Sequence, residues 1–219
     1  MKRKINFINH LLNFSAVVIG VYLAFYINDK AKLNQDKKES FLLMESLASE
    51  LSEDLDIYTN YQISENINHQ EDLKRLLEAL TNNNTDSINE YISAILRVEN
   101  YVPTTSTYNS IKSSGKFSLI ENFEIRRDMS DFYEGLAIES EKKSEFQTDF
   151  FKAQLLPWVV RNIDLQEMKF LNDNEKIVLK NKIIIYESLI SQKIDAYKTV
   201  IKESKMLKEK IESELKLSN

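Results

Sequence analysis

The chain has 219 residues, which is enough for one ordinary domain and a membrane anchor. It contains no cysteine, which excludes disulfides, thiolate metal sites and cysteine nucleophiles, and its net charge of −5 gives no global basic field that would attract nucleic acid. Only three glycines and two prolines occur, and this shortage of turn-forming residues favours a few long helices over β-sheets.

The first predicted element is an apolar helix near the N-terminus. No Asp, Glu, Lys or Arg occurs between Ile5 and Asn28. About 20 apolar residues in a helix, at about 1.5 Å rise each, cross the roughly 30 Å hydrocarbon core of a bilayer. We therefore predict a transmembrane anchor at residues 1–29 and a helical domain at residues 30–219. A cleaved signal peptide is the alternative, but the apolar stretch is longer than usual and ends without a small-x-small cleavage site.

The flanking charges give little information on orientation. Three basic residues lie at positions 2–4, and four lie on the other flank at positions 30, 32, 37 and 38. This difference is too small for the positive-inside rule to decide. We expect a single-pass protein of a bacterial inner membrane with its main domain in the cytoplasm.

One face of the predicted span carries small side chains. Ala16, Gly20 and Ala24 recur every fourth residue, a spacing that lets two membrane helices approach closely. Asn9 and Asn13 extend this stripe toward the N-terminus, where amides can hydrogen-bond between helices or line a narrow wet path. These five residues are the predicted oligomer interface or pore. A location of the asparagines among the lipid headgroups is the alternative.

The region after the span is predicted to begin with one long amphipathic helix. No Gly or Pro occurs between Gly20 and Pro103, and apolar residues follow helical spacing to about Leu80, so this helix is expected to be continuous with the span. A run of Thr, Asn and Asp then favours a turn. Asp86 or Thr85 is the predicted cap of the short helix that follows.

Turn-forming residues divide the middle of the chain. A short helix is predicted from Thr104 to Ser114, closed by Gly115 in a left-handed conformation. Asn122 is the predicted N-cap of a longer helix, which Pro157 kinks or ends.

The last element is an uninterrupted helical pattern from Lys176 to Leu217. Its apolar stripe is close to the 3.5-residue repeat of a coiled coil, with a slip around Ser204. Antiparallel packing against the first long helix is the expected arrangement, and pairing between subunits is the alternative.

The sequence contains few residues that suggest catalysis. It has no P-loop, no glycine-rich dinucleotide turn and no nucleophile elbow. His69 has Glu65 and Asp72 nearby in sequence, but such carboxylates are common on any solvated helix, so a metal site is disfavoured. We expect a protein that is not an enzyme and that has no cofactor and no metal.

One segment has the composition of an anion-binding site. Hydroxyls, amides and cations lie next to two predicted helix N-termini between Pro103 and Arg127, a combination that can bind phosphate groups of a nucleotide or oligonucleotide. A hydroxyl-rich turn with ordinary capping is the alternative. The candidate residues are Tyr108, Lys112, Lys116, Arg126 and Arg127.

Two stretches resemble a large family of bacterial single-span membrane proteins of unknown function. Residues Val18 to Asp29 (VIGVYLAFYIND) are similar to that family's span, and Tyr108 to Asn122 (YNSIKSSGKFSLIEN) are similar to its Ser-Gly-Lys turn and following Ile-x-Asn cap. Together the stretches cover about an eighth of the chain. The chain lacks the family's usual Trp after the span, where Lys30 stands. The resemblance implies an all-helical membrane-anchored domain and no particular activity.

A second resemblance concerns the layout alone. An N-terminal span, a long helix and a compact helical domain are also the layout of Hailong-type membrane effectors of bacterial phage defence. That likeness implies oligomerisation and membrane disruption under nucleic-acid control.

The sequence thus predicts an all-α protein, with an N-terminal transmembrane helix followed by an elongated bundle of long antiparallel helices. The leading hypothesis is a homo-oligomeric, channel-like or membrane-perturbing effector, gated through its helical domain. The alternative is a non-catalytic anchor or scaffold that recruits a partner protein. The expected partners are the lipid bilayer and further copies of the chain, together with a possible nucleotide, oligonucleotide or protein ligand.

Overall fold

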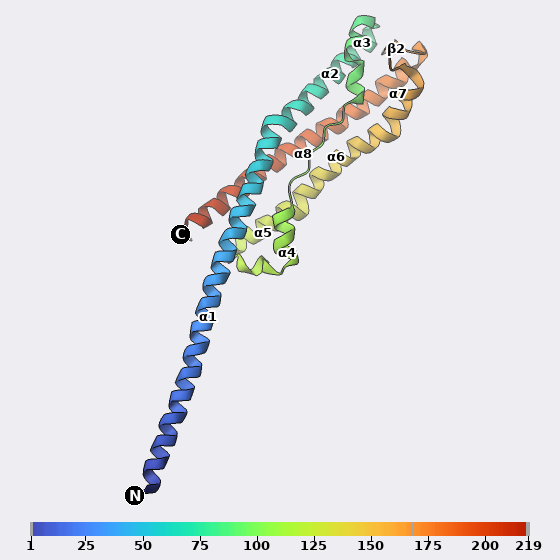
Figure 1. Cartoon of the computed structure of the whole chain (residues 1–219). Helices are drawn as coiled ribbons and strands as arrows, with labels where there is room; N and C mark the ends of the chain where they lie inside the picture. Colours follow the sequence, from blue (N-terminus) through green and yellow to red (C-terminus); the bar gives the residue numbers. More distant parts are fainter. Residues whose placement is uncertain (1, 168, 218–219) are drawn as a thin grey trace.

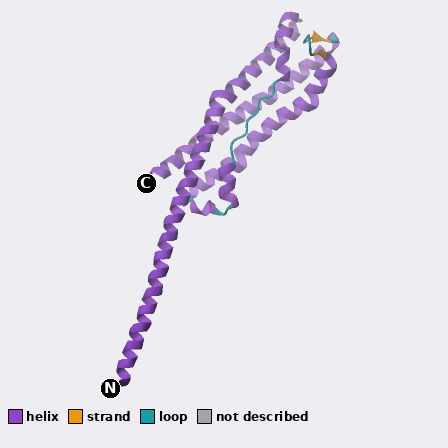
Figure 2. Ribbon diagram, in the orientation of Figure 1, coloured by secondary structure: helices purple, strands orange, loops and turns teal. Residues whose placement is uncertain are grey.

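The computed structural model describes residues 2–167 and 169–217, and their fold is all-α, as predicted (Figures 1 and 2). The basic side chains at positions 2–4, which bear on orientation, lie outside the described side chains. The α-helices are α1 (Lys2–Ile57), α2 (Ile63–Asn82), α3 (Thr85–Tyr91), α4 (Ser106–Ser113), α5 (Phe123–Asp131), α6 (Ala137–Phe150), α7 (Leu156–Asn162) and α8 (Lys176–Leu217). The 3-10 turns are η2 (Ile92–Leu96), η3 (Lys116–Leu119) and η6 (Asp173–Glu175), and the π-helical turns are η1 (Tyr58–Gln62), η4 (Phe132–Leu136) and η5 (Phe151–Leu155).

The dominant element is one helix that runs from α1 through η1 to the end of α2. The predicted continuity between the apolar segment and the first helix of the domain is therefore confirmed. The helix does not break at the predicted domain boundary of residues 29 and 30, since no Gly or Pro lies there to interrupt the backbone hydrogen bonds. Its only irregularity among the described residues is the wider π-helical turn η1.

Three long rods form the helical domain (Figure 1). The first rod is the second half of α1 together with η1 and α2, the second runs from α5 to α7, and the third is α8. α8 returns antiparallel to the first rod, as predicted, and it also contacts α6. A segment without helix, residues 97–105, runs lengthwise along the bundle between η2 and α4 (Figure 2).

The helix ends follow ordinary capping chemistry. Asn83 adopts a left-handed conformation with φ of 52°, and the side chain of Asn84 accepts a hydrogen bond of 3.2 Å from the amide of Ser87. The prediction that Asp86 or Thr85 caps this helix was therefore wrong by one or two positions, because the sharp turn at Asn83 already places Asn84 at the cap. At the next turns, the predictions for Gly115 (φ of 73°) and for Asn122 are confirmed.

The buried stripe of α8 is a regular heptad pattern. The buried residues other than Ile194 form two rows with seven-residue spacing, one through Leu179, Tyr186, Lys193, Val200 and Leu207, and the other through Ile183, Ile190, Tyr197, Ser204 and Ile211. The predicted slip around Ser204 is wrong. Ser204 is buried and occupies a position of the heptad stripe. The stripe therefore contains a polar residue there, but its seven-residue spacing does not shift.

At the tip of the domain, Pro157 does not end the helix. The backbone continues from the π-helical turn η5 into α7, and the proline stands in the first turn of α7, directly after that irregular turn. After α7, β1 (Ile163–Asp164) pairs antiparallel with β2 (Lys169–Phe170) in a short hairpin. No pattern in the sequence predicted this hairpin.

Two apolar clusters stabilise the bundle. The distal cluster lies toward the hairpin end and includes Leu76, Trp158 and Ile183. The proximal cluster lies toward the end from which α1 leaves the bundle, and it includes Leu47 and Met129. Buried polar side chains separate the two clusters on all three rods, and we call them the polar waist: Gln62, Asn66, His69, Ser140, Ser144, Gln147 and Lys193.

Candidate functional site

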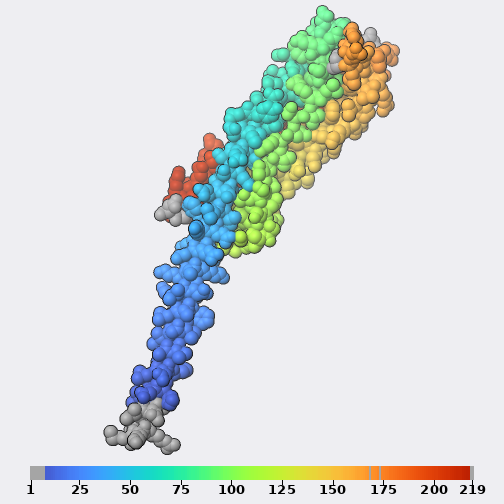
Figure 3. All heavy atoms as spheres, viewed as in Figure 1, coloured from blue at the N-terminus to red at the C-terminus, as the bar shows by residue number. Residues whose placement is uncertain are grey.

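The first candidate site is the part of α1 that stands outside the bundle (Figure 3). Every side chain from Ile8 to Gln35 is exposed, and we call these residues the bare segment. Its most apolar 18-residue window has a mean hydropathy of 1.8 and no buried residue. The bare segment is long and apolar enough to cross a membrane by length and composition, criteria that a signal sequence or a core helix also meets.

The predicted interface residues Asn9, Asn13, Ala16, Gly20 and Ala24 all lie in the bare segment and are exposed. A Cβ atom added to Gly20 would meet nothing within 4 Å, so no contact inside this chain requires a glycine there. A glycine inside a helix costs about 1 kcal/mol relative to alanine. No contact among the described residues therefore explains this cost.

The hydroxyl-rich N-terminus of α4 already binds carboxylates of α1. Glu50 accepts hydrogen bonds from the hydroxyl of Ser106 (2.5 Å) and from the amide and hydroxyl of Thr107 (3.2 and 2.6 Å). Asp54, which is 1% exposed, accepts from the amide and the hydroxyl of Thr104 at 2.8 and 2.9 Å. The predicted affinity of this helix end for anions is thus met by the chain's own side chains.

The predicted cations of the same region also have partners. Lys112 and Tyr108 both donate to Glu134, at 2.6 and 2.5 Å, and Lys116 lies 2.6 Å from a carboxylate oxygen of Glu39. The bond to Glu134 raises the pKa of Lys112, and the same bond lowers the pKa of Glu134.

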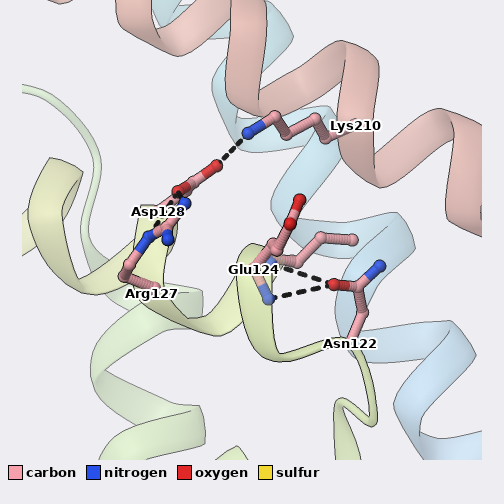
Figure 4. Close-up of polar contacts among 6 residues, drawn as sticks. Asn122, Glu124, Arg127, Asp128 and Lys210 are labelled. Carbon is pink, nitrogen blue, oxygen red and sulfur yellow. Dashed lines mark hydrogen bonds and ion pairs between the residues drawn. The ribbon is translucent and has the colours of Figure 1, made fainter.

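Arg126 and Arg127 point to different partners. Arg126 donates to the carbonyl of Ile120 at 2.9 Å, whereas Arg127 lies 3.1 Å from Asp128. Asp128 also accepts from Lys210 of α8, and this bond holds its pKa below the ordinary value (Figure 4). The five predicted anion-binding residues therefore fall into separate sets of contacts, and a phosphate would have to displace internal partners. The anion site stays a prediction.

The second candidate site is the segment of residues 97–105, which we call the strap. Tyr186 and Tyr197 of α8 bind its backbone: Tyr186 donates to the carbonyl of Arg97 at 2.5 Å, and Tyr197 accepts from the amide of Tyr101 at 2.9 Å. From the other side, Asp54 accepts from the hydroxyl of Tyr101 at 2.7 Å. An extended segment has no hydrogen bonds of its own inside a bundle, so side chains from the surrounding rods satisfy its backbone.

Lys193 is the central residue of this arrangement. Its side chain is fully buried, and its amine donates to the carbonyl of Glu99, to Oδ1 of Asn100 at 3.3 Å and to Oε1 of Gln147. Burial lowers the pKa of Lys193 to about 7, against which the charge of Glu99 acts weakly. Among the described residues, no carboxylate forms an ion pair with this amine.

His69 occupies the neighbouring position on α2. Its Nε2 lies 2.8 Å from the carbonyl of Ala94, its ring packs edge-on to Tyr186 at 5.6 Å, and burial lowers its pKa to about 4. Its Nδ1 is buried without a partner. Asp72, which lies near His69 in the sequence, forms an ion pair with Arg97. The described residues contain no group of three or more carboxylates or histidines that could hold a metal ion.

The sequence does not predict the strap or the burial of Lys193. The apolar stripe predicted for α8 contains no lysine, whereas the buried stripe of the structure includes Lys193. The heptad spacing carries the missing signal, because Lys193 stands seven residues from both Tyr186 and Val200, inside the buried row.

A groove lies where α1 leaves the bundle. It has a volume of about 780 Å³ and is formed by α1, by the residues that precede α5 and by the end of α8. Apolar side chains line much of it, including Leu33, Phe41, Met44 and Ile120.

Comparison with known proteins adds no identity. No protein family, no curated protein and no solved structure matches this chain. The two resemblances therefore stay predictions.

Proposed function

We propose that this protein is a single-pass membrane protein that self-associates through its bare segment and acts as a membrane-perturbing effector, with the helical domain as its controlling part. The observation that carries the proposal is the bare segment itself. It is a long apolar helix whose side chains are all exposed, and it continues without a break into the helical domain.

A bilayer is the environment that best suits this helix. Side chains such as Phe14, Ile19 and Phe25 are 66%, 58% and 65% exposed, and they surround the helix on all sides. An apolar surface of this extent is not stable in water, whereas a helix satisfies its own backbone hydrogen bonds in hydrocarbon. Tyr22 and Tyr26 would lie at one membrane interface, where aromatic side chains are enriched.

The geometry of α1 supports self-association. At about 100° per residue, Gly20 and the buried Leu47 point to opposite sides of the helix. The small-residue face therefore looks away from the chain's own domain. Further along the same side, Leu42 and Glu45 are also exposed, so this side of α1 is accessible where it enters the bundle.

The continuous helix supports a controlling role for the domain. Residues 2–82 form one rod without a loop, so a rotation or shift of α1 in the bundle is passed directly to the bare segment. A flexible linker would uncouple the two parts.

A substitution on the small face tests the proposal. Gly20→Leu places a large side chain between the spans, and Val18→Leu, on the opposite side of the helix, is the matched control. We expect the parent and Val18→Leu to be oligomeric in detergent by light scattering and to depolarise cells that express them. Gly20→Leu should be monomeric and should leave the membrane potential intact. A monomeric parent would overturn the proposal.

A second candidate function is a non-catalytic scaffold, and the exposed apolar side chains at the hairpin end of the domain favour it. Val160, Leu171 and Ile177 are 63%, 64% and 68% exposed, and they belong to α7, to the residues directly after β2 and to the start of α8. These elements meet at the hairpin end of the domain (Figure 1). An oligomer that leaves both potential and growth unchanged on full expression would favour this scaffold over the effector.

A further inference from the structure

We propose that the groove at the point where α1 leaves the bundle binds a phospholipid with an amine headgroup, such as phosphatidylethanolamine, from the bilayer beside it. The proposal rests on the membrane span proposed above, and it names the lipid that the helical domain would recognise. The apolar lining of the groove takes an acyl chain, and the charged side chains around it take the phosphate and the amine.

The groove begins close to the membrane surface that the span would define. The charge-free stretch of α1 ends at Asn28, and Leu33, the first residue that lines the groove, follows five residues later. At about 1.5 Å per residue this distance is about 8 Å, close to the roughly 5–8 Å of one headgroup layer. The C-terminal end of α8 and the segment before α5 lie at the same end of the domain (Figure 1). A lipid of the adjacent leaflet can therefore reach the groove.

Contacts between the surrounding elements hold the groove in shape. Glu39 of α1 pairs with Lys116 of η3 at 2.6 Å, and Asn122 donates to Glu214 of α8 at 2.8 Å. The volume of about 780 Å³ falls within the range of about 300–1,000 Å³ that is usual for small-molecule sites.

The lining presents apolar surface to an occupant. Leu33 and Leu42 are 51% and 50% exposed, and Phe41 is half-buried, whereas Met44 and Ile120 belong to the buried proximal cluster. An acyl chain that covers the exposed part of this lining removes apolar surface from water on both sides of the contact, which favours binding.

The charges around the groove have both signs. Lys37 and Lys38 line it together with Asp36 and Glu121, and none of these four has a hydrogen bond or ion pair to another described residue. Lysines suit a phosphate, and carboxylates suit a primary ammonium, in each case through charge-assisted hydrogen bonds. Phosphatidylglycerol has no amine for the carboxylates, and the trimethylammonium of phosphatidylcholine has no N–H to donate. The mixed lining therefore favours a phospholipid that carries both a phosphate and a primary amine.

The position of the groove on α1 favours a lipid over a second copy of the chain. At about 100° per residue, Leu33 and Met44 lie about 140° and 120° around the helix from Gly20. Spans that pair through the small-residue face would therefore leave the groove open. A lipid bound there would contact α1, α8 and the segment before α5 together, and it would stabilise the arrangement of α1 in the bundle that forms the groove.

Fluorescence quenching by brominated lipids tests the proposal. Phe41→Trp places a reporter in the groove, and the parent, whose one tryptophan is Trp158 of the distal cluster, is the matched control. The full chain in nonionic micelles is titrated with phosphatidylethanolamine, phosphatidylcholine or phosphatidylglycerol that carries brominated acyl chains. We expect phosphatidylethanolamine to quench Phe41→Trp at a concentration about tenfold below that of the other two, the effect of one charge-assisted hydrogen bond, and to leave the parent unquenched. Equal quenching by the three lipids, or none, would overturn the proposal.

Charge variants in the Phe41→Trp chain identify the headgroup contacts. Lys37→Gln combined with Lys38→Gln should raise the phosphatidylethanolamine concentration needed by about tenfold, and Lys30→Gln, on the same helix but outside the groove, should not change it. Glu121→Gln should reduce the preference over phosphatidylcholine. All these positions are exposed, so the substitutions leave the core intact. A lipid preference that stays the same in the lysine and Glu121 variants contradicts the assignment.

Flotation with vesicles of phosphatidylethanolamine and phosphatidylcholine distinguishes a failure of the groove from a failure of the span. A parent chain that floats, while Phe41→Trp is not quenched, keeps the proposed span and removes the lipid site. A parent chain that does not float removes both.

Discussion

The two halves of one helix present opposite cases. The bare segment of α1, residues 8–35, exposes every side chain, whereas residues 40–82 of the same rod bury apolar side chains and also polar ones such as Asp54 and His69. In the bundled half, contacts within the chain account for most of the buried residues. In the bare half, no contact among the described residues accounts for Gly20 or for the apolar surface, and the proposed membrane span and self-association would account for both.

The largest expected difference between the halves comes from removing the same side chain in each. Leu47→Ala leaves a cavity in the proximal cluster, where Leu47 is fully buried, and should lower the free energy of unfolding by about 2–5 kcal/mol. Leu23→Ala in the bare segment, where Leu23 is 49% exposed, should change it by less than about 0.5 kcal/mol. Urea unfolding of both variants in the same micelles measures this, and an equal loss would contradict the division.

An added charge should be harmful in the bare segment and harmless at an exposed position of the bundled half. Ile19→Arg should cost about 2.5–3.5 kcal/mol of membrane insertion, because an arginine at the centre of a span is poorly tolerated. Ser49→Arg, at an exposed position of the bundled half, is the control. Fractionation of expressing cells should show a loss from the membrane for Ile19→Arg alone. If Ile19→Arg stays fully in the membrane fraction, the bare segment does not span.

Each half of the helix contains one histidine, so the pH dependence of stability can be compared between them. Burial lowers the pKa of His69 to about 4 in the folded chain, against 6.5 in a solvated histidine, so the unfolded state binds more protons between these values. Stability that is present above pH 6.5 should fall by up to about 3 kcal/mol as the pH drops to 4. His69→Gln, which keeps a donor for the carbonyl of Ala94, should flatten this loss. His10→Gln in the bare segment should not, and the pH dependence of urea midpoints tests both.

Periodicity and caps allowed much of the fold to be predicted from the sequence. The 3.6-residue pattern and the absence of Gly and Pro were enough for the long first helix and for α8, since both signals act locally along the chain. The αL position of Gly115 and the cap at Asn122 followed from their own side chains. The hairpin at residues 163–170 was not predicted, because strands of two residues are too short to show a periodic pattern.

The internal polar contacts could not be predicted in the same way. Whether Lys112 meets a phosphate or Glu134, and whether Lys193 meets water or Gln147, depends on which distant residues the fold brings together. A lysine is expected to be solvated unless its position in the heptad is known. In α8 the seven-residue spacing gives that position, but the polar residues at 193 and 204 make the apolar stripe look discontinuous.

The smallest expected effect distinguishes the observed cap at the end of the bundled half from the predicted one. Asn84 accepts from the amide of Ser87, so Asn84→Ala should remove this bond and cost about 1 kcal/mol of stability. Asp86→Ala is the control: Asp86 lies in the first turn of α3, where its charge contributes through the helix dipole alone, by about 0.3–1 kcal/mol at low salt. Unfolding at low and high salt separates the two, because the dipole contribution of Asp86 is screened by salt and the hydrogen bond of Asn84 is not. A loss in Asp86→Ala that persists at high salt and exceeds the loss in Asn84→Ala would mean that the helix is capped by Asp86.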